Sequence, residues 1–78
     1  MSAVHQATRI TTDREALERI VLHAFEMPLA FRKAFLLCDI QGFTVNETAA
    51  ILRISPEAVS SRLNRARREL NVRLAVSA

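Results

Sequence analysis

The spacing of apolar residues along the chain predicts four helices joined by short turns. Apolar side chains recur three and four residues apart, as on one face of a helix, and the expected helices cover about residues 13–26, 28–41, 44–52 and 56–74. The last helix is the clearest, because a single apolar stripe continues along it through Val59, Leu63, Ala66, Leu70 and Leu74. The expected fold is therefore an all-α, compact four-helix domain over residues 12–76, preceded by a flexible lead-in over residues 1–11.

Residue types that start and end helices stand at the expected boundaries. Thr12–Glu15 and Thr44–Glu47 have the sequence of a capping box. Pro28 suits a first helical turn and is expected to open the second helix. Gly42, the only glycine, is expected to end that helix in a left-handed conformation. In the dipeptide Ser55-Pro56 the serine suits an N-cap and the proline the first residue of the last helix.

The third and fourth predicted helices have the layout of a helix-turn-helix, with no wing. A short helix, a link of three residues (53–55) and a longer helix make up this unit, in which the second helix enters the major groove of DNA. Ile54 is expected to pin the two helices together, and Ala49 and Ala50 are expected on the inner side of the short helix. An ordinary helical hairpin has the same layout, so the spacing alone does not establish DNA binding.

The positive charge of the chain is concentrated in the last helix. Residues 1–55 carry six basic and six acidic side chains, whereas residues 56–78 carry five arginines and two glutamates, so the net charge of +3 lies entirely in the second segment. A basic helix beside a neutral body is typical of nucleic-acid binding. A solvated helix face is the alternative explanation.

A helical projection of the last helix separates base-reading positions from phosphate-binding positions. Successive residues are placed about 100° apart with the apolar stripe facing inward, and Arg, Asn, Ser and Glu side chains can all hydrogen-bond to base edges. Base contacts are expected from Glu57, Ser60, Ser61, Asn64 and Arg65. Phosphate contacts, which orient a protein on DNA without reading its sequence, are expected from Arg53, Arg62, Arg67 and Arg68.

The sequence shows none of the patterns typical of enzymes or metal sites. We find no catalytic triad, glycine-rich phosphate loop or cluster of metal ligands, so no enzyme activity, cofactor, metal or small-molecule substrate is expected. His5 and His23 are expected to be surface residues, and Cys38 a buried structural thiol. No segment approaches the roughly 20 apolar residues of a membrane span, and no signal peptide is visible, so a cytoplasmic protein is expected.

The motifs of the chain resemble region 4 of the extracytoplasmic-function (ECF) sigma factors of bacterial RNA polymerase. Residues 28–37 are similar to the family's opening L-P-x-x-x-R-x-x-F-L-L, and residues 42–44, 47–49 and 52–55 fall where it has G-x-S, E-I-A and L-x-I-S. Residues 59–70 (VSSRLNRARREL) are similar to V-x-S-R-L-x-R-A-R-x-x-L. The resemblance covers about residues 13–74.

This resemblance implies that the last helix recognises the −35 promoter element, with base-reading positions on Ser60, Ser61, Asn64 and Arg65. It implies double-stranded promoter DNA and the flap of the polymerase β subunit as partners, and an anti-sigma factor that masks the domain. The chain departs from the family at Ser60, where a basic residue is frequent, at Glu57-Ala58, which replaces Gly-Thr, and at Met27, which replaces Leu. These departures bear on the promoter sequence rather than on the fold.

The family's region 2 has no counterpart here, so we expect either an excised C-terminal domain or a stand-alone sigma-like protein. With roughly 4–6 phosphate contacts, its affinity for DNA should fall steeply with salt.

Two other functions are consistent with the pattern. A LuxR-type regulator output domain has a similar four-helix layout, although that family usually carries a histidine-containing pattern where residues 62–67 stand. A protein-interaction module is the second alternative, because the side chains of Phe25, Leu29, Phe31 and Phe43 do not all fit one small core. These four are expected to form an exposed docking patch, with filling of the core as the alternative.

Overall fold

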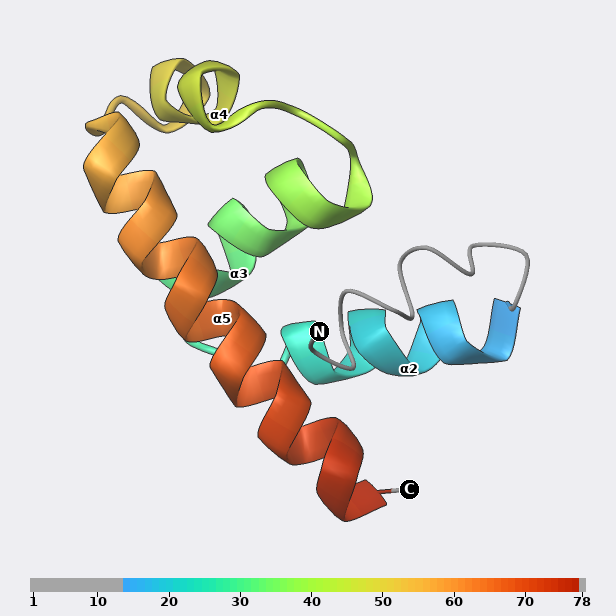
Figure 1. Ribbon diagram of the computed structural model, residues 1–78. Coiled ribbons are helices and arrows are strands. Elements are labelled where there is room, and N and C mark those ends of the chain that lie inside the picture. Colours follow the sequence, from blue (N-terminus) through green and yellow to red (C-terminus); the bar gives the residue numbers. More distant parts are fainter. Residues whose placement is uncertain (1–13, 78) are drawn as a thin grey trace.

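All regular elements in the described part of the chain are helices (Figure 1). The computed structural model describes residues 14–77, so Thr12 of the first predicted capping box, His5 and the lead-in lie outside the described residues. The elements in order are α2 (Arg14–Ala24), α3 (Leu29–Phe35), the π-helical turn η1 (Leu36–Ile40), α4 (Val45–Leu52) and α5 (Pro56–Ser77). The all-α fold with a helix-turn-helix is confirmed.

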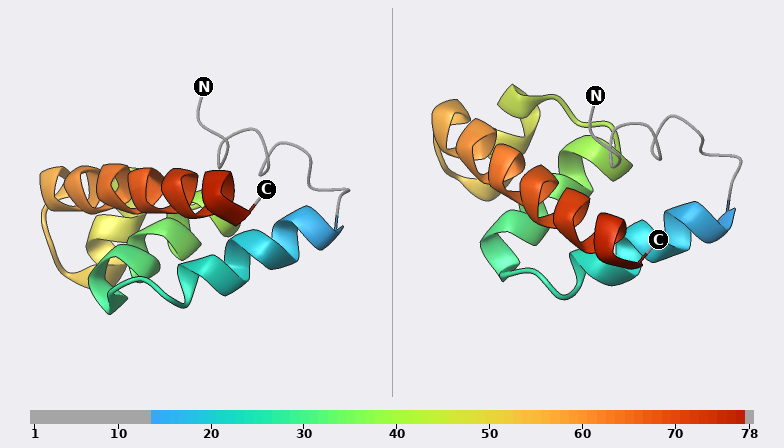
Figure 2. Two further views of the ribbon diagram at one scale, coloured as in Figure 1. Left: turned by 90° about the horizontal axis from the view of Figure 1, so that it is seen from below. Right: turned by 60° about the horizontal axis from the view of Figure 1, so that its bottom comes forward.

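The core lies between α5 and the other helices. Helices α2, α3 and α4 all pack against α5, which lies along one side of them in the left panel of Figure 2. The predicted apolar stripe is confirmed: Val59, Leu63, Ala66 and Leu70 are buried, and Leu74 packs at the edge of the core. Because burial of one such large apolar side chain contributes about 1.5–3 kcal/mol, the stripe determines which side of α5 stays exposed.

The second helix differs from a regular helix at both ends. Pro28 stands at the N-cap and α3 begins one residue later, with the Pro28 carbonyl accepting hydrogen bonds from the amides of Phe31 and Arg32. At the other end the Gln41 amide donates to the Leu36 carbonyl at 2.9 Å, which makes η1 a wide π turn. Apolar spacing predicted a continuous helix here, because such a turn leaves the apolar character of the segment unchanged.

The two predicted signals between η1 and α4 are confirmed. Gly42 has a φ of +83°, in the left-handed region that glycine tolerates best. The Thr44 side chain accepts a hydrogen bond from the Glu47 amide at 3.0 Å, and the Thr44 amide donates to Glu47 Oε1 at 2.9 Å. The hydrogen bond from the Thr44 amide to the carboxylate is the main cause that lowers the pKa of Glu47 below its usual value.

The turn of the helix-turn-helix is formed by residues 53–55, as predicted. Arg53 has a left-handed conformation (φ 58°, ψ 45°), and its amide donates to the Ala49 carbonyl. Ser55 Oγ accepts a hydrogen bond from the Ala58 amide at 3.1 Å, so Ser55 is the N-cap of α5. Ala49 is buried, but Ala50 is exposed, and its predicted inward position is wrong. The turn therefore joins α4 to α5 through Arg53, which has a strained backbone conformation, and Ser55, which caps α5.

Candidate nucleic-acid interface

The first half of α5 presents a polar surface on the side opposite the core. The buried stripe faces α2, α3 and α4, so the residues about half a turn away from it face outward. All five residues predicted to contact bases are exposed: Glu57, Ser60, Ser61, Asn64 and Arg65. We call these five residues the α5 polar surface. The hydroxyl, amide, carboxylate and guanidinium groups on it can donate to or accept from base edges in a major groove.

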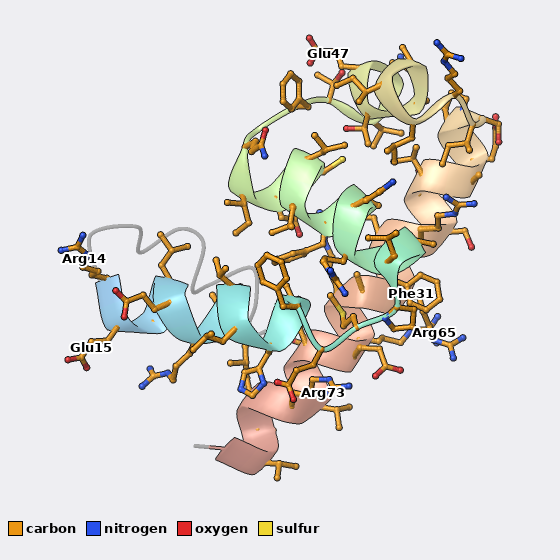
Figure 3. All side chains as sticks on the ribbon, turned by 180° about the vertical axis from the view of Figure 1, so that it is seen from behind. Arg14, Glu15, Phe31, Glu47, Arg65 and Arg73 are labelled. Carbon is orange, nitrogen blue, oxygen red and sulfur yellow. The ribbon has the colours of Figure 1, made fainter. Side chains whose placement is uncertain are left out.

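Arg65 lies on one edge of this surface and already has two partners. Its guanidinium lies 5.6 Å from the centre of the Phe31 ring, and its Nε lies 3.8 Å from Glu69 Oε1 (Figure 3). The Arg65 side chain is nevertheless 58% exposed. Ion pairs as exposed as this one contribute less than about 1 kcal/mol, so the guanidinium can leave Glu69 at small cost.

Arg67 is held by a carboxylate from η1, against the expectation that it contacts phosphate. Its Nε donates to Asp39 Oδ2 at 2.8 Å and its Nη2 donates to Asp39 Oδ1 at 2.7 Å. These two bonds raise the pKa of Arg67, since they favour the charged guanidinium. The predicted phosphate contact assumed an arginine whose N–H groups all face solvent. Asp39 instead accepts hydrogen bonds from two of the five N–H groups of Arg67, in a bidentate pair.

The other arginines that were predicted to bind phosphate lie around the α5 polar surface. Arg53 is exposed in the turn before α5, Arg68 is exposed on the outer side of α5, and Arg62 is half-buried on its flank. Arg73, near the end of α5, pairs with Glu26, with Nη1 3.5 Å from Oε2. The cationic excess that the sequence assigned to all of α5 is therefore divided: part of it faces outward near the polar surface, and part joins α5 to the rest of the domain.

The four residues predicted to form one apolar docking patch lie in two separate parts of the structure. Phe25 and Leu29 are exposed at the connection between α2 and α3, and Phe31 is half-buried in the first turn of α3. Phe43 follows η1, at the opposite end of the segment formed by α3 and η1, which is roughly 18 Å long at 1.5 Å per residue. Phe43 is thus not part of a common patch. We call Phe25, Leu29 and Phe31 the apolar corner.

Arg32 organises the apolar corner, a role that the sequence did not reveal. Its Nη2 donates to the carbonyls of Phe25 and Met27, both at 3.1 Å, and its guanidinium lies 5.1 Å from the centre of the Phe25 ring. The guanidinium satisfies carbonyl groups just beyond the end of α2, which would otherwise lack intrahelical partners. Only the folded connection brings these groups together.

Asp39 is the other functional residue that sequence reasoning missed. A usable signal was present, because a carboxylate within the apolar run of residues 34–40 needs a cationic partner when it is half-buried. The partner itself was not predictable, since 28 residues separate Asp39 from Arg67.

Two side chains expected at the surface or in the core are half-buried instead. His23 Nδ1 lies 2.8 Å from Glu26 Oε1, and Cys38 Sγ lies 3.2 Å from Thr48 Oγ1. Among residues 14–77 no cluster of three His, Cys, Asp or Glu side chains is placed to hold a metal ion. In the same range no helix is long and apolar enough to span a membrane.

Comparison with known protein families shows which family the chain belongs to. The family model described as Sigma-70, region 4 matches residues 26–70, which is 45 of the 78 residues. Searches of curated proteins and of solved structures return no match. The matched segment contains α3, η1, α4 and the first part of α5, and so includes the helix-turn-helix and the α5 polar surface. The chain therefore belongs to the sigma-70 region 4 family, the non-catalytic DNA-binding domain with which sigma factors bind promoter DNA and act with RNA polymerase.

Proposed function

We propose that this domain recognises the −35 promoter element as part of an ECF-type sigma factor, and that α5 reads the bases in the major groove. The observation that carries the proposal is the α5 polar surface: five hydrogen-bonding side chains are exposed on the first half of a helix whose opposite side is buried. The N-terminal part of a recognition helix is the part that contacts base edges. A sigma domain with this surface has the shape and chemistry to read a short duplex site.

Asn64 and Arg65 are the residues best suited to discriminate between bases. The Asn64 amide can pair with adenine through two hydrogen bonds, and the Arg65 guanidinium can do the same with guanine after leaving Glu69. Each such bidentate contact contributes about 1–3 kcal/mol of discrimination against a wrong base. Ser60 and Ser61 have shorter side chains, and the Glu57 carboxylate can only accept hydrogen bonds. These three residues therefore adjust the preference at neighbouring positions.

Phosphate binding is assigned to Arg53, Arg62 and Arg68. These arginines surround the α5 polar surface at the turn, on the flank and on the outer side of the helix. Contacts of this kind hold the protein in register on the duplex, but they do not read its sequence. Arg67 is left out of the set because Asp39 binds its guanidinium.

Docking of the polymerase β flap is assigned to the apolar corner. Phe25 and Leu29 are 57% and 55% exposed, so one short connection exposes two large apolar side chains. An anti-sigma factor that covers the same corner would compete with the polymerase. A protein partner at this corner would lie beside the DNA-reading surface, because the Phe31 ring of the corner contacts Arg65 of the α5 polar surface.

The assignment of base contacts is tested by selecting bound duplexes from random-sequence DNA at low salt. We expect the wild-type chain to enrich one short motif, and the Asn64→Ala and Arg65→Ala variants to lose preference at one or two positions of it. The control is Arg19→Ala, which removes an exposed arginine from α2 and should leave the motif unchanged. If all four proteins enrich the same motif, Asn64 and Arg65 do not contact bases. If the wild-type chain enriches no motif at all, the proposed recognition of a promoter element is refuted.

A further inference from the structure

Two neighbouring residues of η1 contact the two helices of the helix-turn-helix. Cys38 contacts α4, where its Sγ lies 3.2 Å from Thr48 Oγ1. Asp39 contacts α5, where it accepts both hydrogen bonds from Arg67. Single π turns within helices frequently occur at functional sites. The turn joins α4 and α5 at a point remote from their own connection, so it can affect how α5 is presented to DNA.

The pair of Asp39 and Arg67 has the geometry of a strong and specific contact. Both carboxylate oxygens are used, at 2.8 and 2.7 Å, in the parallel arrangement that suits a guanidinium. The Asp39 side chain is only 12% exposed, and that of Arg67 is 34% exposed. A pair that is this shielded from solvent is weakened little by salt. An arginine held in this way does not offer the same N–H groups to a phosphate.

Arg67 lies on one flank of α5, between the buried stripe and the α5 polar surface. In projection it stands about 60° from the centre of the buried stripe, on the same flank as Ser60 and Asn64. It follows Asn64 by three residues and Ser60 by seven, so the three side chains lie above one another on successive turns. Without Asp39, the long Arg67 side chain would be free to reach a phosphate beside the base-reading positions.

We propose that Asp39 is a positioning residue that withholds Arg67 from the DNA backbone. By holding and neutralising this guanidinium, Asp39 removes one phosphate contact, and DNA binding then depends more on the base contacts of the α5 polar surface. The inference rests on the proposed function, because it concerns how the same helix binds a duplex. It assigns a role in DNA binding to a residue outside the helix-turn-helix.

The test measures how affinity for a random-sequence duplex depends on KCl concentration, using fluorescence anisotropy on the full chain. Each phosphate contact contributes about 0.9 to the slope of log K against log salt concentration. We expect the Asp39→Asn slope to be steeper than the wild-type slope by about 0.9, because Arg67 is released. We expect the Arg67→Gln slope and the slope of the double variant Asp39→Asn/Arg67→Gln to equal that of the wild type.

Glu18→Gln is the control for net charge. It makes the same change of charge as Asp39→Asn and breaks the exposed Arg14–Glu18 pair on α2, so its slope should stay at the wild-type value. Circular dichroism checks the folding of each variant. If Asp39→Asn does not fold, the slopes of the wild type and of Arg67→Gln are compared instead. A slope that is shallower by about 0.9 in Arg67→Gln means that Arg67 already contacts phosphate in the wild type, and this result overturns the inference.

The outcomes separate this inference from the proposed function. A merely structural role of Asp39 predicts weaker binding at an unchanged slope, and that result also overturns the inference. A wild-type chain with no measurable affinity for the duplex at low salt instead overturns the proposed function. A steeper slope in Asp39→Asn that disappears in the double variant supports both.

Discussion

Replacing Arg53 by glycine should make the domain more stable and its DNA binding weaker. Arg53 has φ 58° and ψ 45°, and it is the only residue other than glycine with a positive φ in the described part of the chain. In this region the β-carbon of an L-residue lies too close to the following carbonyl oxygen. The cost is roughly 1–2 kcal/mol for residues other than glycine. The substitution keeps the amide that donates to the Ala49 carbonyl, so the end of α4 stays capped.

The net gain in stability follows from two opposing effects. Glycine relieves the strain of the folded turn, but its unfolded chain is more flexible, which costs about 0.4–1 kcal/mol. The difference leaves a gain of about 0.5–1 kcal/mol in the free energy of unfolding. For a domain of this size, 1 kcal/mol corresponds to a rise in Tm of about 4–8 °C. Thermal unfolding followed by circular dichroism resolves a shift of this size.

Arg53→Ala is the matched control, because alanine keeps the strained β-carbon but lacks the charge. We expect its Tm to stay close to that of the wild type. Both variants remove a proposed phosphate contact, so both slopes of log K against log salt concentration should become shallower by about 0.9. The reasoning about strain is refuted if Arg53→Gly unfolds at a lower temperature than the wild type, or if both variants gain equally. Unchanged slopes would show that Arg53 does not bind phosphate.

Two further predictions concern the cap of α4 and the apolar corner. The pKa of Glu47 is lowered in the folded state from its usual value near 4.5, so its ionised form stabilises the domain above that pH, and the contribution is lost as the pH falls through the lowered pKa. Urea unfolding at several pH values should therefore show the wild type more stable than Glu47→Gln at neutral pH, with the difference vanishing in acid; a difference that persists in acid contradicts this. Leu29→Ser should weaken binding to the isolated polymerase β flap by about tenfold, as expected when a buried apolar anchor worth roughly 1–2 kcal/mol is lost, with the Tm little changed. The control is Ile51→Ser, which changes an apolar residue of similar exposure on α4; equal loss in both variants would argue against docking at the apolar corner.

The local signals in the sequence were sufficient for the helices and for most of the candidate site. The apolar stripe from Val59 to Leu74 predicted both the course of α5 and its exposed side, because a helix buries residues spaced three and four apart. Thr44, Glu47, Gly42 and Ser55 act on groups within a few residues of themselves, so their roles follow from their neighbours in the chain.

The tertiary structure decided which of the exposed or charged residues are available to a partner. Arg67 looked equivalent to Arg68 in the sequence, but the crossing of α3–η1 beneath α5 brings Asp39 to one flank of α5 and Phe31 to the other. The sequence pattern groups Phe43 with Phe25, whereas the length of the α3–η1 segment places them apart. The spacing of apolar residues predicts which side of a helix is buried, but not which residues of other helices it contacts. Contacts between residues far apart in the chain depend on the angles and positions at which the helices pack, and these are set by the whole core.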